Sequence, residues 1–300
     1  MKKKLKNILK DQDRAKFRIL TGLKFAIIPI LSLLFLLILS YVILAVSLAA
    51  MDTFHVDKSF ILHDLVKSFI SHTIVSMLPW VSGMFVILFI IGLFIGSLML
   101  RPFKNIAEYC ENRLNGIEES YDPLFSTDLK LLNSFAEWFF LMVEDSSRFN
   151  QEIPVKFRGI HKPVFEKNFF LYNFLIIIIV TILTAITIHY LSLEMFEDIV
   201  EVVNEVFSTK NQVTVFTSSL YRIFFNISNL SIAFNVVLYM AFMFHIYSKV
   251  STPAFGIFAT MRSFIMGKRE SRVHLIGYTY IRSYTRTLNK YLDQEARSKD

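Results

Sequence analysis

The chain has 300 residues, of which 54% are hydrophobic and 19% charged, and its formal net charge is +7. This composition, with a mean hydropathy of +0.48, excludes an ordinary soluble domain and indicates that apolar residues are concentrated in membrane segments. The single cysteine, Cys110, excludes an intrachain disulfide and a Cys-rich metal site.

Four long apolar runs organise the chain. A basic arm at 1–24 comes first, and the runs then contain no Asp, Glu, Lys or Arg over 25–51, 74–100, 169–193 and 224–248. Each run exceeds the roughly 20 residues that a helix needs to cross about 30 Å of hydrocarbon. We therefore expect an all-α membrane protein with four transmembrane helices, at 25–51, 74–100, 169–193 and 224–250.

The basic residues predict the orientation of these spans. Only four of the 32 Lys and Arg lie in the segments 52–73 and 194–223, namely Lys58, Lys67, Lys210 and Arg222. The positive-inside rule makes these two segments external and places the arm, the residues 101–168 and the C-terminal end in the cytoplasm. The positive charge flanks spans and forms no nucleic-acid-binding motif, so membrane lipid is an expected partner and nucleic acid is not.

The two cytoplasmic segments repeat each other. At an offset of 151 residues the identical pairs are Pro102 and Pro253, Ile106 and Ile257, Gly116 and Gly267, Glu119 and Glu270, Ser120 and Ser271, and Leu124 and Leu275. The chain therefore reads as two duplicated pairs of spans, each pair followed by a similar cytoplasmic segment.

Each cytoplasmic segment has the pattern of two amphipathic helices. A proline suits the first turn of a helix, and a glycine suits the position just after its end. Met261 lies on the apolar stripe of the second copy, while the adjacent Arg262 is expected to be exposed and tolerant of substitution. The stripes of the first helix are Phe103, Ile106, Cys110, Leu114 and Ile117 in one copy and Ala254, Ile257, Met261 and Ile265 in the other. The stripes of the second helix are Leu129, Leu132, Phe135 or Ala136, and Phe139, then Ile281, Tyr284, Leu288 and Tyr291.

This layout resembles the HAMP domain, the signalling linker of bacterial chemoreceptors and sensor kinases. The family has a proline at the membrane exit, a glycine after the first helix, and an acidic pair followed by spaced Ile, Leu and Phe-Asn in the second. The matching residues of the second copy are Thr279, Tyr280, Ile281, Tyr284, Leu288, Asn289 and Tyr291, without the acidic pair. Those of the first copy are Asp128, Leu129, Leu132, Ala136, Glu137 and Phe139, about one residue out of register and without Phe-Asn.

The resemblance implies HAMP-like units at 101–145 and 251–293, separated by a cytoplasmic linker at 146–168 and followed by a tail at 294–300. Family members form parallel four-helix bundles from two copies, which implies either a pseudo-dimer within this chain or a homodimer. The alternative is an antiparallel helical hairpin in each segment, lying on the membrane face. The predicted packing residues of the units are Pro102, Ile106, Cys110, Gly116, Pro253, Ile257, Met261 and Gly267.

Two further patterns concern the spans and the external segments. Gly92 and Gly96 have the small-xxx-small spacing that lets membrane helices approach closely. His55, His63 and His72 invite a metal hypothesis, but His63 and His72 lie on opposite sides of a helix. We expect no metal, no cofactor and no catalytic residues, because the sequence has no phosphate loop, nucleophile elbow or Cys/His ligand cluster.

The expected function is non-enzymatic transmembrane signalling or signal modulation. The HAMP-like units would relay shifts of the membrane helices to a separate cytoplasmic partner or receptor, in a bacterial inner membrane with both termini cytoplasmic. The alternative is a membrane scaffold or an accessory subunit of a transport complex. Mild-detergent co-purification distinguishes the two.

Overall fold

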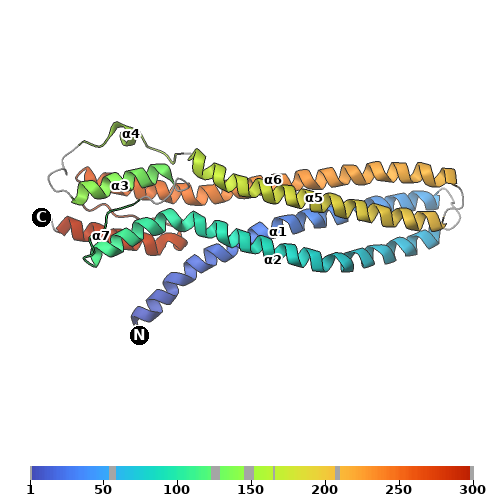
Figure 1. Ribbon diagram of the computed structural model, residues 1–300, viewed down its shortest axis with the longest axis horizontal. Coiled ribbons are helices and arrows are strands. Elements are labelled where there is room, and N and C mark those ends of the chain that lie inside the picture. The colour runs from blue at the N-terminus through green and yellow to red at the C-terminus, as the bar shows by residue number, and fades with distance from the viewer. Residues whose placement is uncertain are drawn as a thin grey trace. The chain divides into compact units, whose positions relative to one another are not determined.

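The computed structural model describes residues 2–53, 59–122, 129–144, 152–164, 166–206 and 210–297. The regular secondary structure of these residues is helical, with four long and several short elements (Figure 1). The long helices are α1 (Lys2–Thr53), α2 (Ser59–Leu114), α5 (Lys167–Val206) and α6 (Lys210–Ile265). The short elements are α3 (Lys130–Glu144), α4 (Val155–Arg158), the 3-10 turn η2 (Thr279–Ile281) and α7 (Arg282–Arg297).

The predicted membrane spans are confirmed at the level of helix length and composition. Among the described residues, four helices are long and apolar enough to cross a membrane, with these stretches at Gln12–Val46, Met77–Leu114, Lys167–Glu201 and Thr217–Ile265. The predicted external segments, 52–73 and 194–223, largely continue the same helices. In the first, α1 ends at Thr53 and α2 begins at Ser59; in the second, α5 ends at Val206 and α6 begins at Lys210.

The chain divides into two compact units. The first, which we call the apolar unit, comprises residues 23–90 and 176–242, and the second, the junction unit, comprises residues 1–22, 91–175 and 243–300. Each long helix contributes residues to both units.

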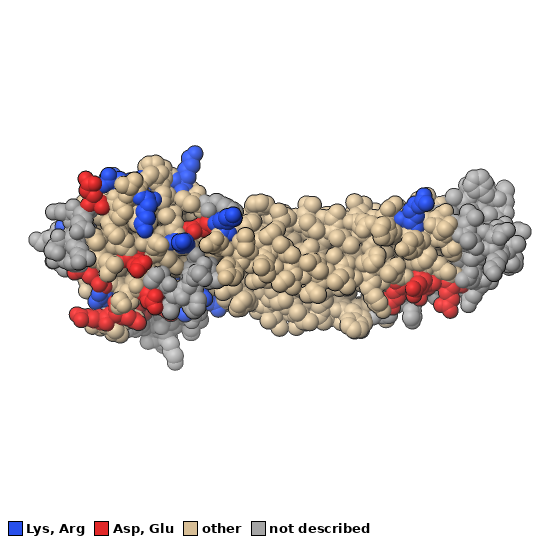
Figure 2. Space-filling view, turned by 45° about the horizontal axis from the view of Figure 1, so that its top comes forward, with Lys and Arg blue, Asp and Glu red and all other residues tan. Residues whose placement is uncertain are grey.

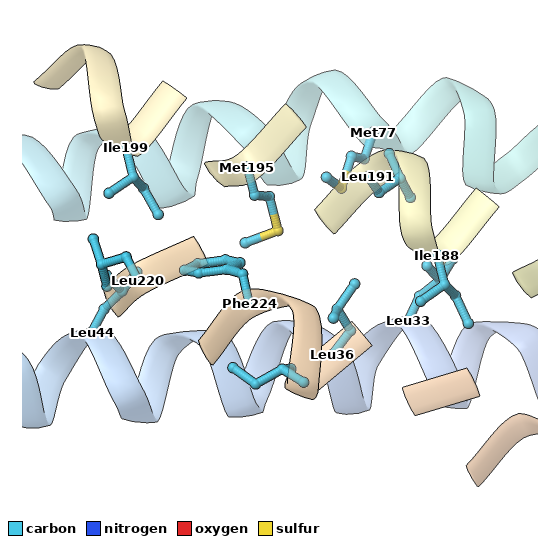
Figure 3. Packing of buried hydrophobic residues seen from close by; sticks show 11 residues of the cluster. Leu33, Leu36, Leu44, Met77, Ile188, Leu191, Met195, Ile199, Leu220 and Phe224 are labelled. Atoms are coloured by element: carbon cyan, nitrogen blue, oxygen red, sulfur yellow. The ribbon is translucent and has the colours of Figure 1, made fainter. Parts of the chain in front are cut away.

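The apolar unit is a bundle of segments from α1, α2, α5 and α6 whose side chains converge on a shared core (Figure 3). Phe224 is 2% exposed and Ile188 is fully buried. The buried cluster consists of Leu33, Leu36, Leu44, Met77, Ile188, Leu191, Met195, Ile199, Leu220, Phe224 and Ile227. Packing of this kind, rather than transfer out of water, is what holds helices together in lipid.

The outer face of the apolar unit is as hydrophobic as its core. Ile186 and Val237, for example, are 61% and 63% exposed. The charged residues of this unit whose side chains are described all lie outside the four uncharged runs. Figure 2 shows a correspondingly broad surface without Lys, Arg, Asp or Glu. A continuous apolar surface is unstable in water and is satisfied by hydrocarbon.

Candidate functional site

The predicted signalling residues lie in the junction unit, where α2 and α6 end in the same way. Both helices have 56 residues. Gly116 and Gly267 follow their ends with φ angles of 78° and 89°, a backbone region that favours glycine. The Ile117 and Lys268 N–H groups then donate to Asn112 O at 3.0 Å and Ser263 O at 3.1 Å, the bonds of a Schellman helix stop.

The two prolines do not begin new helices, which corrects the expectation from sequence. Pro102 and Pro253 are buried inside α2 and α6, and each helix continues through its proline. A proline inside a helix leaves the carbonyl four residues earlier without its usual N–H donor. For Pro253 that carbonyl belongs to Lys249, and the Tyr280 hydroxyl donates to it at 2.7 Å. The missing helical bond is therefore replaced by a side chain from η2.

The apolar stripes after the prolines face the interior of the junction unit. Cys110 and Met261 are fully buried, and Ile106 and Ile257 are each 2% exposed. Ile117 differs from expectation, because it lies beyond the glycine that ends α2 and is 52% exposed. The stripe of α2 ends with the helix.

Aromatic side chains connect the helices of the segments 101–145 and 251–293, which we call the first and second copy after the duplication predicted from the sequence. The Phe135 ring of α3 lies 4.4 Å from the Phe258 ring of α6, between ring centroids. The Tyr109 ring of α2 lies 4.1 Å from Phe140 of α3 and 6.3 Å from Tyr291 of α7. Four helical segments, two from each copy, therefore share one core within a single chain.

The contacts also give the direction of these helices. On α3, Phe135 contacts Phe258 and the later Phe139 contacts the later Phe264 at 6.2 Å, so α3 runs parallel to α6. On α2, Tyr109 contacts Phe140, and the later Arg113 pairs with Glu144 at the end of α3. An antiparallel hairpin would pair early positions with late ones, so the contacts contradict that alternative for the first copy.

In the second copy, the connector between α6 and η2, residues 266–278, is held against both α6 and α7. Asn289 of α7 accepts from Val273 N–H at 2.8 Å and donates to Val273 O at 3.1 Å. Leu275 packs so closely on α6 that a Cβ added at Gly256 would lie 2.7 Å from Leu275 Cδ2. Arg272 donates to Asp293 at 2.7 Å. In the first copy, Leu124 lies outside the described residues.

The N-terminal arm packs against the second copy. The Phe17 ring of α1 stacks on Tyr280 with the ring centroids 4.3 Å apart. One turn earlier, Arg14 donates to the Tyr284 hydroxyl at 3.2 Å, and its guanidinium lies over the Tyr284 ring. Burial raises the pKa of Tyr280, which keeps its hydroxyl protonated as the donor to Lys249 O. Tyr280 thus contacts both the arm and the proline turn of α6.

The linker before α5 is anchored by Arg262, for which the sequence predicted no contact, and by Glu166, which sequence reasoning did not single out. The Arg262 guanidinium donates to Phe157 O and Arg158 O at 3.3 Å and to Ile160 O at 2.7 Å, at the end of α4. Arg262 is therefore half-buried and hydrogen-bonded, not the exposed residue that the sequence predicted. Glu166 accepts from Leu131 N–H at 2.7 Å near the start of α3, and burial raises the pKa of its carboxyl group.

The predicted glycine contact falls between α1 and α2. Gly92 and Gly96 are both buried. A Cβ added at Gly96 would lie 3.2 Å from Arg18 Cα and 3.3 Å from Thr21 Cβ, so the α1 backbone approaches closely there.

An open cleft of about 790 Å³ lies at the ends of α2, α3 and α7. Its walls include Arg113, Glu119 and Glu144 from the first copy and Tyr291 and Glu295 from the second. No group of three or more metal-ligating side chains occurs among the described residues. The side chains of His55, His63 and His72 lie outside that part of the chain.

Comparison with protein-family models, with characterised proteins and with solved structures finds no match for this chain.

Proposed function

We propose that this protein is a non-enzymatic transmembrane signalling or signal-modulating protein, and that its junction unit is a HAMP-like four-helix bundle built within one chain. The observation that carries the proposal is the parallel packing of α3 against both α2 and α6, with α7 touching α2 and α3. Two copies supply such a bundle in the family that the sequence resembles, and here one chain supplies both.

The continuity of the long helices supports a relay. Because α2 and α6 pass through Pro102 and Pro253 without ending, a shift of either span along its axis is transmitted to Cys110 or Met261 in the shared core. A close-packed core resists gradual deformation and tends to occupy discrete arrangements. The spans would thereby select between packings of the junction unit.

The same proposal places the protein in a bacterial inner membrane, with both termini and the junction unit in the cytoplasm. The low count of Lys and Arg in 52–73 and 194–223 supports this orientation. A reporter enzyme active only outside the cytoplasm should work when fused after Ser59 or Lys210. It should fail after Ser147 or Asp300, and activity at Ser147 would overturn the orientation.

The signalling role is tested by identifying what co-purifies with the intact chain from mild detergent. We expect kinase or receptor-array components, and their loss from the variant Ala136→Asp, which introduces an unpaired charge at a fully buried position of α3. The control is Glu137→Lys, because Glu137 is the exposed neighbour of Ala136 on the same helix. Recovery of transporter subunits instead would favour the accessory-subunit function.

A further inference from the structure

Three polar side chains of α6 are buried in the apolar unit. Ser228 and Ser231 are fully buried and Asn235 is 1% exposed. Their spacing of three and four residues places them on one face of the helix. Both Ser hydroxyls and both amide atoms of Asn235 are without a hydrogen-bond partner among the described residues. We call these three residues the α6 polar face.

Contacts of α6 to α1 and to α5 lie at the two ends of this face. One turn beyond Asn235, the Tyr239 hydroxyl donates to Phe25 O of α1 at 3.4 Å. At the other end, about one turn before Ser228, Ser192 of α5 donates to Phe224 O at 3.4 Å. The α6 polar face is thus flanked along the helix by contacts to the two neighbouring helices.

Two other buried polar side chains of the same unit bond within their own helix, whereas a single further hydroxyl, that of Ser40 in α1, also lacks a partner among the described residues. The Ser32 hydroxyl donates to Ile28 O at 3.1 Å, and the Thr184 hydroxyl donates to Val180 O at 2.8 Å. Serine and threonine commonly take this bond to the preceding turn in membrane helices. The α6 polar face does not take it, although leaving a polar group unpaired in an apolar interior is costly.

The chemistry of Asn235 defines what fits. Its Nδ2 needs an acceptor and its Oδ1 needs a donor, so the ligand must offer both. A cation would serve the oxygen atoms and leave Nδ2 unpaired, whereas an anion would serve Nδ2 and leave Oδ1 unpaired. Water offers both in one small molecule, and buried water typically makes about three hydrogen bonds to such groups. We propose that the α6 polar face is a hydration site, which binds ordered water molecules between α1, α5 and α6.

The proposal goes beyond the signalling role and does not depend on it. Hydrogen bonds to water re-form in a new geometry more readily than bonds between fixed side chains. Bound water therefore gives α6 a face that can move against α1 and α5 without leaving its buried polar groups unpaired.

Hydroxyl-radical labelling by X-ray radiolysis of the full chain in nanodiscs tests this site, because radicals form where water is bound. Tyr239 is 1% exposed and is the reporter, while Met195 is 2% exposed in the apolar cluster and is the dry control. We expect Tyr239 to be labelled severalfold faster than Met195, after correction for intrinsic reactivity. Asn235→Leu should abolish that difference, and Thr187→Ala, at an exposed hydroxyl, should preserve it.

Ser231→Ala provides a second variant with little risk to folding, and it should lower Tyr239 labelling in the same direction. If Tyr239 is labelled as slowly as Met195 in the wild-type protein, the site is dry and the proposal is wrong. Rapid labelling that neither variant reduces would also overturn it, because the water would then lie elsewhere.

Discussion

The Tyr280 hydroxyl donates a hydrogen bond to Lys249 O at 2.7 Å, and Lys249 O is the carbonyl that Pro253 leaves without a helical donor. Tyr280→Phe removes this donor and keeps the ring that stacks on Phe17. We expect the free energy of unfolding of the junction unit to fall by about 1–3 kcal/mol, the usual cost of an unpaired buried acceptor.

A double-mutant cycle makes this prediction specific. Pro253→Ala restores a backbone N–H that can donate to Lys249 O, so Tyr280→Phe should cost clearly less in that background. Thermal unfolding in detergent measures each cost. Equal costs in both backgrounds would mean that the hydroxyl does not replace the missing helical bond.

Arg262 should be one of the more sensitive charged residues of the junction unit. Arg262→Ala removes the donor to three carbonyls at the end of α4 and should destabilise the linker by about 1–3 kcal/mol. Limited trypsin digestion should then cut faster after Lys156 and Arg158. The matched control, Arg286→Ala at an exposed position of α7, should leave the digestion rate unchanged.

The buried carboxyl of Glu166 predicts a pH dependence. Because burial raises its pKa in the folded protein, the folded state holds this proton more tightly than the unfolded state. Its contribution to stability is therefore present below the ordinary pKa of a glutamate and is lost as the pH rises through the raised pKa.

Glu166→Gln keeps an oxygen acceptor for Leu131 N–H and removes the ionisation. The variant should match the wild type in acid and exceed it in melting temperature at neutral pH. The exposed Glu137→Gln is the control. A wild-type advantage that grows with pH would contradict this account of Glu166.

The close contact at Gly96 predicts sensitivity to side-chain size. Gly96→Leu must displace α1, since even a Cβ would lie 3.2 Å from Arg18 Cα, and overpacking of this kind costs about 1–3 kcal/mol. Gly83→Leu is a matched control on the same helix, because no atom lies within 4 Å of a Cβ there. Comparable melting temperatures for the two variants would show that the approach of α1 to Gly96 is not tight.

The membrane spans were predictable because an uncharged run such as 74–100 is long enough to cross hydrocarbon whatever surrounds it. The helix starts at Pro102 and Pro253 were predicted wrongly, because both helices continue through their prolines. For Pro253, a local rule about proline cannot reveal that Tyr280, 27 residues further along the chain, supplies the missing bond. The role of Arg262 was missed for a similar reason. Its carbonyl partners lie more than 100 residues away in the sequence.

The central claim is that the helices of both copies form one bundle within a single chain. Its most direct test is cysteine crosslinking between Tyr109 of α2 and Tyr291 of α7, whose rings lie 6.3 Å apart. The double variant Tyr109→Cys, Tyr291→Cys in a Cys110→Ser background is treated in membranes with a short bifunctional maleimide. The account predicts a monomer of altered gel mobility, absent from each single variant and from the pair Tyr109→Cys with the exposed Arg286→Cys. A covalent dimer that requires both cysteines would contradict it, because the bundle would then be built between chains.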